Sequence, residues 1–576
     1  MINERDNSLT PIAQIFKNRG MNYTVEDIYH YLNTTENDTY PSTMLKNMEC
    51  GAAMLARHIA NNDKILLVVD DDCDGFTSSA LLMNYLHLLF PYFVENNIQY
   101  YIHEGKKHGI LNTDIIMPDI ALVIAPDSSS NEYALHEKLA QQGIDILILD
   151  HHKAPYYSQH ACVINNQLDD YPTKSLSGVG IVYKFCKYLD EQLDVEYADL
   201  FLDLVALGIT ADVMSMCDYE TRYLVSNGLE HFRNPLIKAL YAKTEFSINK
   251  SGGLSPYNLA YYIAPFLNAT ARVGTVKEKT ILFESLLEFK AYDQIASTKR
   301  GCAGQMESIV EQAARNCTNI KSRQTKERDI DYELIESMIK KQNLLQNKIL
   351  LIQMEKGEPA IAGLIANLLV AKYHHPTLIL YKMGDMWQGS ARNDSRYGLE
   401  DFRQFMRDCD LVNFAEGHES AFGTQIANEN INKFIEYSNK ALQDYEFSPV
   451  DRVDFIINAN QLASEFILDI GKLHYIWGQE ISEPLIAIEH IVITNDNLSI
   501  IGKKEDTIKI MLPNGISLMK FGSTADEIGT LIPETSTGCV IINALGVCNI
   551  NNYNDQEYPQ IIINEYEIVG RQSYYF

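Results

Sequence analysis

Acidic and histidine side chains gather at four places in the 576-residue sequence, each predicted to lie at the end of a buried strand. A single aspartate in such a position is more often a helix cap or a solvated turn residue than a ligand. Two adjacent histidines there are less usual, because imidazole gains little unless something binds it. The four clusters are Asp70, Asp72 and Asp74 in ILLVVDDDCDG, Asp127 after ALVIAP, Asp150-His151-His152 after IDILILD, and Asp212 in DLVALGITADVMSM.

Together the clusters can do chemistry that none of them can do alone. Like charges packed this tightly repel each other, and hard cations such as Mg²⁺ or Mn²⁺, which prefer oxygen ligands, remove that repulsion. The carboxylates and imidazoles suffice for two metal ions that share a bridging carboxylate. Two such ions, ~4 Å apart, grip both the attacking and the leaving oxygen of a phosphoryl displacement. The residues therefore predict hydrolysis of a phosphodiester or a pyrophosphate.

The elements around the clusters predict a parallel sheet. Between residues 61 and 235, short continuous apolar runs alternate with helical segments, which is typical of a parallel sheet covered on both faces. The carboxyl ends of parallel strands meet at one edge of the sheet, where ligands bind. Gly75 is expected to let the chain turn there, and Thr77, Ser78 and Ser79 are expected to cap the next helix.

Four further regions flank this sheet in a chain that we predict to be of the α/β class. Residues 1–60 are predicted to form a helical cap. Residues 236–347 are predicted to form a helical connector, in which TNIKSRQTKERDIDYE is either one long helix or partly loop. Residues 348–447 carry a second α/β pattern. Residues 448–576 carry short β-type runs between turns, which favours a small sandwich or barrel.

The composition limits the kinds of partner. The net charge of −28 argues against a protein that coats itself with nucleic acid through a general basic surface. A narrow basic channel, or metals that neutralise a substrate phosphate, is compatible with that charge. The ten cysteines include no CxxC pair, so neither a zinc ribbon nor a disulfide framework is indicated. The lack of a long apolar run or of a signal pattern in MINERDNSLT predicts a cytoplasmic protein without membrane contact.

The motifs resemble those of the DHH phosphoesterase superfamily and, within it, the RecJ single-strand-DNA exonucleases. DDDCDG is similar to the first family motif, PDSSSNE to the second, and Asp150-His151-His152 to the triplet that names the family. LSGVGIVYKF and DLVALGITADVM are similar to the segments around the fourth motif. IAPFLNATARVG contains the Asn-Ala-x-x-Arg signature of RecJ-like members. GSAR and EGHESAFG resemble the DHHA1 domain, and INALGVCNINNYNDQEYPQIIINEYEIV resembles the terminal oligonucleotide-binding (OB) barrel.

The resemblance implies an architecture and an activity. The DHH catalytic domain would span 61–235, the DHHA1 domain 348–447 and an OB-like β-barrel 448–576. The implied enzyme is a 5′ to 3′ exonuclease of DNA repair or recombination, which hydrolyses single-stranded DNA with two divalent metal ions, Mn²⁺ in preference to Mg²⁺. A single-strand-binding protein or a helicase is the implied partner, and the implied oligomeric state is a monomer.

The resemblance also implies roles for individual residues. Asp74, Asp127 and His152 would be the catalytic residues, with His152 in contact with the scissile phosphate. Asp203, nine residues before Asp212, is expected to be structural. The implied metal ligands are Asp70, Asp72, Asp74, Asp127, His151 and Asp212, and the implied substrate-binding residues are Asn268, Arg272, Ser390, Arg392, Gly417 and His418.

Three departures from the family pattern concern the metals and the substrate. Asp71 stands where RecJ proteins more often carry an aromatic or neutral residue, which predicts an extra charge beside the metals. Glu416 replaces a usual glycine and would repel a phosphate unless it points away. In YYIHEGKKHGI, Lys106 and Lys107 would supply the positive charge expected in that stretch.

Two other functions remain open on the sequence alone. One is an oligoribonucleotide or cyclic-dinucleotide phosphodiesterase, against which the chain length and the signature from Asn268 to Arg272 count. The other is a non-catalytic replication scaffold, which the intact acidic and histidine residues oppose. Surface ion pairing is the alternative role of Arg272 and Arg392. Tyr397 is a candidate for stacking on bases.

Overall fold

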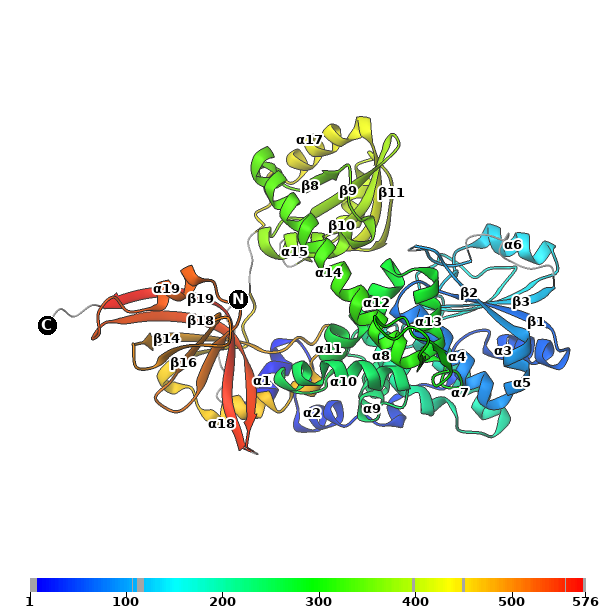
Figure 1. Cartoon of the computed structure of the whole chain (residues 1–576), viewed down its shortest axis with the longest axis horizontal. Coiled ribbons are helices and arrows are strands. Elements are labelled where there is room, and N and C mark those ends of the chain that lie inside the picture. Colours follow the sequence, from blue (N-terminus) through cyan, green and yellow to red (C-terminus); the bar gives the residue numbers. More distant parts are fainter. Residues whose placement is uncertain are drawn as a thin grey trace. The chain divides into compact units, whose positions relative to one another are not determined.

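The computed structural model describes residues 8–105, 107–110, 119–395, 399–447, 451–554 and 556–572. The chain forms two compact units (Figure 1). One combines the chain up to Asn316 with the segment from Arg452 onward, and the other is Cys317–Asp451. Lys106 and Tyr397 lie outside the described residues. Within those residues, no helix is long and apolar enough to cross a membrane.

A five-stranded sheet forms the centre of the first unit, and all its strands run parallel, as predicted. Residues 65–69 of the first strand are all buried, because helices cover both faces. Figure 1 shows α6 (Tyr133–Gln141) on one face, and α3 (Met48–Ala60) and α4 (Cys73–Leu89) on the other. The strand order is β2-β1-β3-β4-β5, with β1 at Lys64–Val69, β2 at Ile98–Ile102, β3 at Ile120–Pro126, β4 at Asp145–Asp150 and β5 at Cys162–Asn165.

The other helices of this unit precede the sheet, fill one crossover, or follow the last strand. They are α1 (Pro11–Asn18), α2 (Val25–Leu32), α5 (Pro91–Asn97), α7 (Gly178–Leu193), α8 (Leu202–Ala211), α9 (Tyr219–Glu230), α10 (Pro235–Lys250), α11 (Pro256–Asn258), the π-helical turn η5 (Leu259–Ile263), α12 (Ala264–Val273) and α13 (Val276–Leu286). A short hairpin, β6 (Gln294–Ala296) and β7 (Met306–Ser308), precedes α14 (Ile309–Gln342). The segment TNIKSRQTKERDIDYE lies inside α14, which is one continuous helix of 34 residues.

The helix after β1 begins earlier than predicted. Asp72 is its N-cap, and the Asp72 Oδ1 atom accepts a hydrogen bond of 3.0 Å from the Gly75 backbone N–H. An aspartate cap satisfies a backbone donor that the helix itself leaves free, so α4 starts at Cys73. Thr77, Ser78 and Ser79 are buried inside α4, and the prediction that they cap it was wrong.

Asp212 does not follow a strand. The apolar run before it forms the buried helix α8, and Asp212 is the C-cap of that helix. A continuous apolar run is compatible with a buried strand and with a buried helix, because neither leaves a polar face to set the periodicity. Three of the four predicted clusters therefore lie at strand ends, and the fourth reaches the site from a helix.

The second unit contains a five-stranded mixed sheet in the order β11-β12-β10-β9-β8. One face packs on a core that includes Trp387, Phe402, Phe422 and Phe434. Its strands are β8 (Leu350–Met354), β9 (Thr377–Met383), β10 (Met386–Arg392), β11 (Val412–His418) and β12 (Ala421–Ala427), and its helices after α14 are α15 (Ala362–Tyr373), α16 (Phe402–Asp408) and α17 (Ile431–Ala441).

The C-terminal region is built on a seven-stranded sheet in the order β13-β14-β18-β19-β17-β16-β15. The strands are β13 (Phe455–Asn458), β14 (Leu485–Ile493), β15 (Leu498–Ile501), β16 (Thr507–Met511), β17 (Ser517–Lys520), β18 (Cys539–Tyr553) and β19 (Gln556–Gln572), with helices α18 (Ser464–Gly471) and α19 (Ala525–Leu531).

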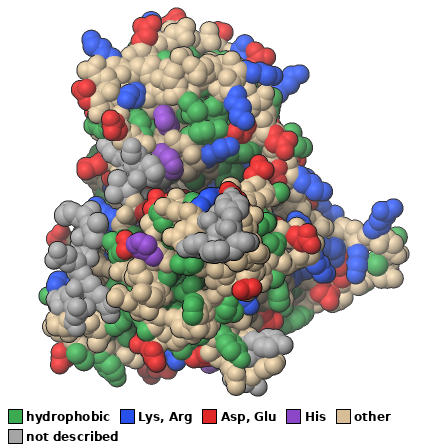
Figure 2. Space-filling model, turned by 90° about the vertical axis from the view of Figure 1, so that its left-hand side faces the viewer, with side chains coloured by type: hydrophobic (Ala, Val, Ile, Leu, Met, Phe, Trp, Pro, Cys, Tyr) green, Lys and Arg blue, Asp and Glu red, His purple; other side chains and the backbone are tan. Residues whose placement is uncertain are grey.

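Acidic and basic side chains are interspersed on the face of the molecule that Figure 2 shows, so no general basic coat is present there.

A buried arginine joins three parts of the first unit. Arg222 of α9 is 1% exposed, and its guanidinium donates to the backbone oxygen of Tyr31 at 2.6 Å and to that of Ile476 at 3.1 Å. Tyr31 belongs to α2, and Ile476 belongs to the C-terminal region. Arg19 of the N-terminal segment also pairs with Asp454 at 2.5 Å. The N-terminal segment therefore contacts both the α9 region and the C-terminal region.

We expect Arg222→Leu to lower the free energy of unfolding by roughly 3 kcal/mol, because it leaves two buried carbonyl groups without their charged donor. Urea unfolding followed by circular dichroism measures this loss. The matched control is Arg57→Leu, which removes an exposed arginine paired with Asp145 and should cost less than about 1 kcal/mol. Equal stability of the two variants would contradict the assigned role of Arg222.

Candidate metal centre

The four predicted clusters meet at the carboxyl edge of the first sheet. The Nε2 atom of His151 lies 3.2 Å from Asp127 Oδ1, 3.4 Å from Asp212 Oδ2 and 4.0 Å from Asp74 Oδ2. β1, β3 and β4 run parallel, so their carboxyl ends bring the first three clusters together. Asp212 completes the group from the end of α8.

Three overlapping sets of side chains in the described part of the chain could each hold a metal ion. Within each set, one ligand atom per residue lies within 4.8 Å of the others. Asp127 belongs to two sets, and His151 also belongs to two. The sets are Asp70, Asp72 and Asp127; Asp74, His151 and Asp212; and Asp127, Asp150, His151 and His152.

The buried oxygen atoms at the centre of this group fit a cation. Asp127 Oδ1 and Asp212 Oδ2 are buried and receive no hydrogen bond from the described residues. Burial, and next the nearby Asp74 carboxylate, raises the pKa of both Asp127 and Asp212 well above the usual range. Burial also raises the pKa of Asp74 to about 6. Oxygen ligands beside one imidazole suit Mn²⁺ or Mg²⁺, whose charge would remove this repulsion.

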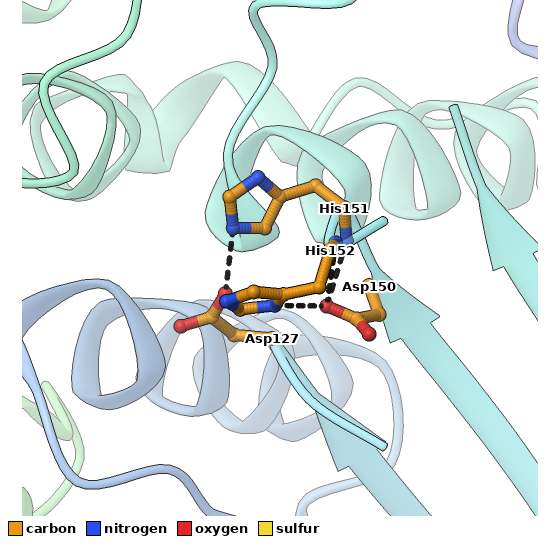
Figure 3. Close-up of side chains that lie close together, drawn as sticks. All are labelled: Asp127, Asp150, His151 and His152. Atoms are coloured by element: carbon orange, nitrogen blue, oxygen red, sulfur yellow. Dashed lines mark hydrogen bonds and ion pairs between the residues drawn. The ribbon is translucent and has the colours of Figure 1, made fainter. Parts of the chain in front are cut away.

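Asp150 organises the two histidines that follow it (Figure 3). Asp150 Oδ1 accepts hydrogen bonds from the His151 backbone N–H at 2.8 Å and from His152 Nδ1 at 2.8 Å, and Oδ2 accepts one from the Ser130 backbone N–H at 3.1 Å. Burial alone would raise its pKa, but these donors, first the His152 imidazole, hold the pKa well below its usual range. Asp150 is thus a charged anchor whose oxygens are already engaged.

The Asp150 carboxylate also favours the protonated, positively charged form of His152. Burial lowers the pKa of His152, but Asp150 outweighs that effect and raises the pKa to about 10. The side chain of His152 is 52% exposed, whereas that of His151 is 6% exposed. Asn165 also donates to the His152 backbone oxygen at 2.9 Å. His152 therefore presents a held, positively charged imidazole at the accessible side of the centre.

Helix α7 points its amino end at Asp74. The Asp74 carboxylate accepts hydrogen bonds from Ser177 Oγ at 2.9 Å and from the Gly178 and Val179 backbone N–H groups at 2.6 and 3.2 Å. Free N–H groups and the dipole at a helix start stabilise a negative charge. These donors bond to both carboxylate oxygens and fix the orientation of Asp74.

Glycines allow the carboxylates to approach so closely. A Cβ atom on Gly178 would lie 2.4 Å from Asp127 Oδ1, and one on Gly208 would lie 2.4 Å from Asp74 Oδ1. Asp127 itself has a φ of 61°, in the left-handed region that few residues other than glycine, asparagine and aspartate adopt. Any side chain at either glycine would displace an acidic side chain of the centre.

Asp70 is held by residues of the segment between β2 and β3. His108 Nδ1 lies 2.7 Å from Asp70 Oδ2, and the Gly109 backbone N–H donates to Oδ1 at 3.0 Å. His103 Nε2 in turn bonds to the Gly109 backbone oxygen at 2.8 Å. These contacts fall in the stretch where Lys106 and Lys107 were predicted to supply charge, and Lys107 is exposed.

Asp71 does not add a free charge beside the metals. Its Oδ1 atom pairs with Lys279 Nζ of α13 at 2.6 Å, and both side chains are fully buried. Lys279 also donates to the backbone oxygens of His103 at 3.2 Å and Gly105 at 2.8 Å. Burial raises the pKa of Asp71 to about 7, although Lys279 opposes that shift. The predicted extra charge is therefore neutralised within the protein.

Two of the six predicted substrate-binding residues belong to the first unit, on α12. The Asn268 Oδ1 atom accepts a hydrogen bond of 3.0 Å from the Cys73 backbone N–H, one residue from Asp72 and Asp74. Arg272 lies one turn further along the helix, and its Nε atom is buried without a hydrogen-bond acceptor in the described protein.

Asp203 accepts hydrogen bonds from three backbone N–H groups, those of Leu204, Arg233 and Asn234, which agrees with the expected structural role.

The other four predicted residues lie in the second unit. Arg392 on β10 and His418 on β11 both lie opposite Ala421 of the intervening β12, and antiparallel partners share a face of the sheet. Ser390 shares that face, as does the exposed Glu416. Gly417 has a φ of 132°, and a Cβ atom there would lie 2.9 Å from the Ala421 backbone oxygen.

Sequence reasoning missed three side chains that bond to the acidic residues, Ser177, His108 and Lys279. It also missed Asn165, which donates to the His152 backbone oxygen. A signal for Lys279 was present, because helical periodicity places it on the apolar face of VKEKTILFESL, below Leu282 and Phe283. A lysine buried on such a face needs an acidic partner.

We expect Lys279→Met to lower the free energy of unfolding by about 3–5 kcal/mol, because it leaves the Asp71 charge buried and unpaired. Asp71→Leu combined with Lys279→Met removes both charges and should recover most of that loss. Chemical denaturation of the two variants and the wild type measures the effect. A double variant as unstable as Lys279→Met would show that the pair does not compensate.

The chain matches two family models: the N-terminal domain of the DHH family over residues 64–209 and the RecJ OB domain over residues 453–565. A putative SPbeta prophage-derived single-strand DNA-specific exonuclease of Bacillus subtilis, YorK, is 35% identical over 99% of this chain and 98% of its own length. The single-stranded-DNA-specific exonuclease RecJ of Bacillus subtilis is 26% identical over 97% of this chain and 68% of its own length.

The fold agrees with these matches. The crystal structure of RecJ in complex with Mn²⁺ from Thermus thermophilus superposes with a TM-score of 0.73 at 16% identity, over 97% of this chain and 76% of that one. The predicted parallel-sheet DHH domain and C-terminal OB domain are both confirmed. The chain belongs to the RecJ-like family of single-strand-DNA-specific exonucleases.

Proposed function

We propose that this protein is a RecJ-type exonuclease that hydrolyses single-stranded DNA from its 5′ end with two divalent metal ions. The observation that carries the proposal is the pair of buried oxygens beside His151, Asp127 Oδ1 and Asp212 Oδ2, which receive no hydrogen bond from the described part of the chain. The relatives are named single-strand DNA-specific exonucleases, which supports single-stranded DNA as the substrate rather than a cyclic dinucleotide or a short oligoribonucleotide.

The donor sets support a division of the ligands between two ions. Asp74, His151 and Asp212 would hold one ion, Asp70 and Asp72 would hold the other, and Asp127 would bridge them. Mn²⁺ is the preferred ion in this proposal, with Mg²⁺ as the alternative. When bound, such ions supply an activated water and stabilise charge on the scissile phosphate.

The side chains around the metal ligands would position the substrate. His152, charged and held by Asp150, would contact the scissile phosphate. Arg272, whose Nε atom finds no acceptor among the described residues, would contact a neighbouring phosphate, and Asn268 would keep the first-motif loop in place. From the second unit, Ser390, Arg392, Gly417 and His418 would bind the strand or its terminal phosphate. We further propose a cytoplasmic monomer that acts with a single-strand-binding protein or a helicase.

Asp127→Ala should abolish Mn²⁺-dependent release of nucleotides from single-stranded DNA, because it removes the ligand shared by both ion sites. Calorimetric titration with Mn²⁺ should also give a weaker or smaller binding signal. Glu137→Ala, on the exposed face of α6, is the matched control and should behave like the wild type. Wild-type activity in the folded Asp127→Ala variant would refute the site.

Substitutions of His151 and His152 should affect metal binding and catalysis differently. His151→Ala should weaken Mn²⁺ binding, since its imidazole lies among the carboxylates. His152→Ala should leave Mn²⁺ affinity within about twofold and lower kcat by ~10²–10³-fold, the loss typical of one charge-stabilising donor. If His152→Ala instead lost metal and kept kcat at saturating Mn²⁺, the two roles would have to be exchanged.

The substrate is tested by degradation of oligonucleotides that carry a label at one end. The protein with Mn²⁺ should release mononucleotides from the 5′ end of single strands and leave blunt duplex largely intact. Release from the 3′ end, or hydrolysis of dinucleotides alone, would contradict the proposal.

A further inference from the structure

Two exposed tyrosines form a stacked pair on the helical run that leads to Asn268. Tyr257 on α11 is 57% exposed and Tyr261 in the π-helical turn η5 is 61% exposed. Their ring centroids are 5.8 Å apart, and the ring planes differ by 9°. π-helical turns inside α-helices are frequent at functional sites. The pair presents an extended aromatic surface to solvent.

The helical run that carries the tyrosines joins the C-terminal region to the metal centre. At its start, Asn258 Nδ2 lies 2.9 Å from His474 Nε2 of the C-terminal region. At its end, Asn268 Oδ1 accepts the hydrogen bond from Cys73, in the loop of the first acidic cluster. α11, η5 and α12 thus form one uninterrupted connection between these two places.

Helical spacing places the two tyrosines on the same side of this run as Asn268 and Arg272. Leu259, Ile263, Leu267 and Thr270 are fully buried on the opposite face. Tyr261 precedes Asn268 by seven residues, which is about two helical turns or ~10 Å along the axis. The face therefore carries, in order, Tyr257, Tyr261, Asn268 and Arg272.

We propose that this face is the track along which the single-stranded substrate leaves the metal centre, with Tyr257 and Tyr261 as a platform for its bases. The inference rests on the proposed exonuclease function, whose substrate passes Asn268 and Arg272. Aromatic side chains stack on any base, so the platform serves an enzyme without sequence preference. A protein of net charge −28 gains more from such stacking than from phosphate contacts.

The test compares two double variants. Tyr257→Leu/Tyr261→Leu removes both rings, and Tyr257→Phe/Tyr261→Phe keeps the aromatic faces without the hydroxyl groups. Fluorescence anisotropy in EDTA, where no hydrolysis occurs, measures the affinity for labelled 20-nucleotide oligo-dT. We expect the leucine pair to bind about tenfold more weakly for each ring lost, and the phenylalanine pair to bind within about twofold of the wild type. Tyr92→Leu on α5, where the tyrosine is 77% exposed, is the control and should leave the affinity unchanged.

The length of the substrate gives a second measurement. Stacked nucleotides repeat every ~3.4 Å, so a dinucleotide that ends beside Asn268 does not cover the further ~10 Å along the helix to Tyr261. The leucine pair should therefore raise KM for the 20-mer and leave the hydrolysis of pTpT unchanged.

Three outcomes would overturn the platform. Unchanged affinity of the leucine pair would mean that the face does not hold DNA and would favour a protein partner there. Equal loss in the phenylalanine pair would assign the effect to the hydroxyl groups. A loss with Tyr92→Leu as well would make the effect non-specific. Failure of the exonuclease function would appear separately, as wild-type protein that binds oligo-dT but does not degrade it with Mn²⁺.

Discussion

Mutual repulsion among buried carboxylates is the constraint on which the rest of this structure depends. Asp70, Asp74, Asp127 and Asp150 are each at most 2% exposed and lie at one edge of one sheet. Water cannot solvate them, so each needs protein donors or a cation. The donors are distributed unevenly: Asp150 is bonded on both oxygens, Asp74 faces a helix start, and Asp70 has an imidazole and a backbone N–H. Among the described residues, none donates a hydrogen bond to Asp127 Oδ1 or Asp212 Oδ2. These two oxygens lie at the centre of the group, where a metal would bind.

This distribution explains why elements far from the sheet contribute to the site. The amino end of α7, the loop around His108, and the α12–α13 pair each supply donors or acceptors to a different part of the acidic group. Asn268 and Lys279 bond to the first-motif loop on either side of Asp72. Asn268 accepts from the Cys73 backbone N–H, and Lys279 pairs with the Asp71 carboxylate. The connector helices are therefore part of the metal centre's support, and a shift of α12 would move both the centre and Arg272.

The fold and the centre of the site could be predicted because they depend on short-range patterns. Buried strands that end in Asp127 or in Asp150-His151-His152 are recognisable locally, and parallel strands bring their carboxyl ends together whatever the loops do. The setting of Asp212 was predicted wrongly, because its apolar run suits a buried helix equally well. The partner of Asp71 is 208 residues away in sequence, and no local pattern connects the two. The faces of the second unit follow from strand register, which the sequence does not reveal.

The charge balance shapes how such an enzyme can hold its substrate. A strongly acidic protein repels a polyanion at long range, so we expect its phosphate contacts to be few and local, as proposed for His152 and Arg272. Affinity from phosphate contacts falls steeply with salt because counterions are released, whereas stacking on aromatic rings does not depend on that release. An exonuclease with few phosphate contacts and a tyrosine platform should therefore lose less affinity between low and physiological salt than one that binds through a basic surface. The same net charge disfavours non-specific binding along nucleic acid, so a low general affinity and a tolerance of salt would both follow from one charge distribution.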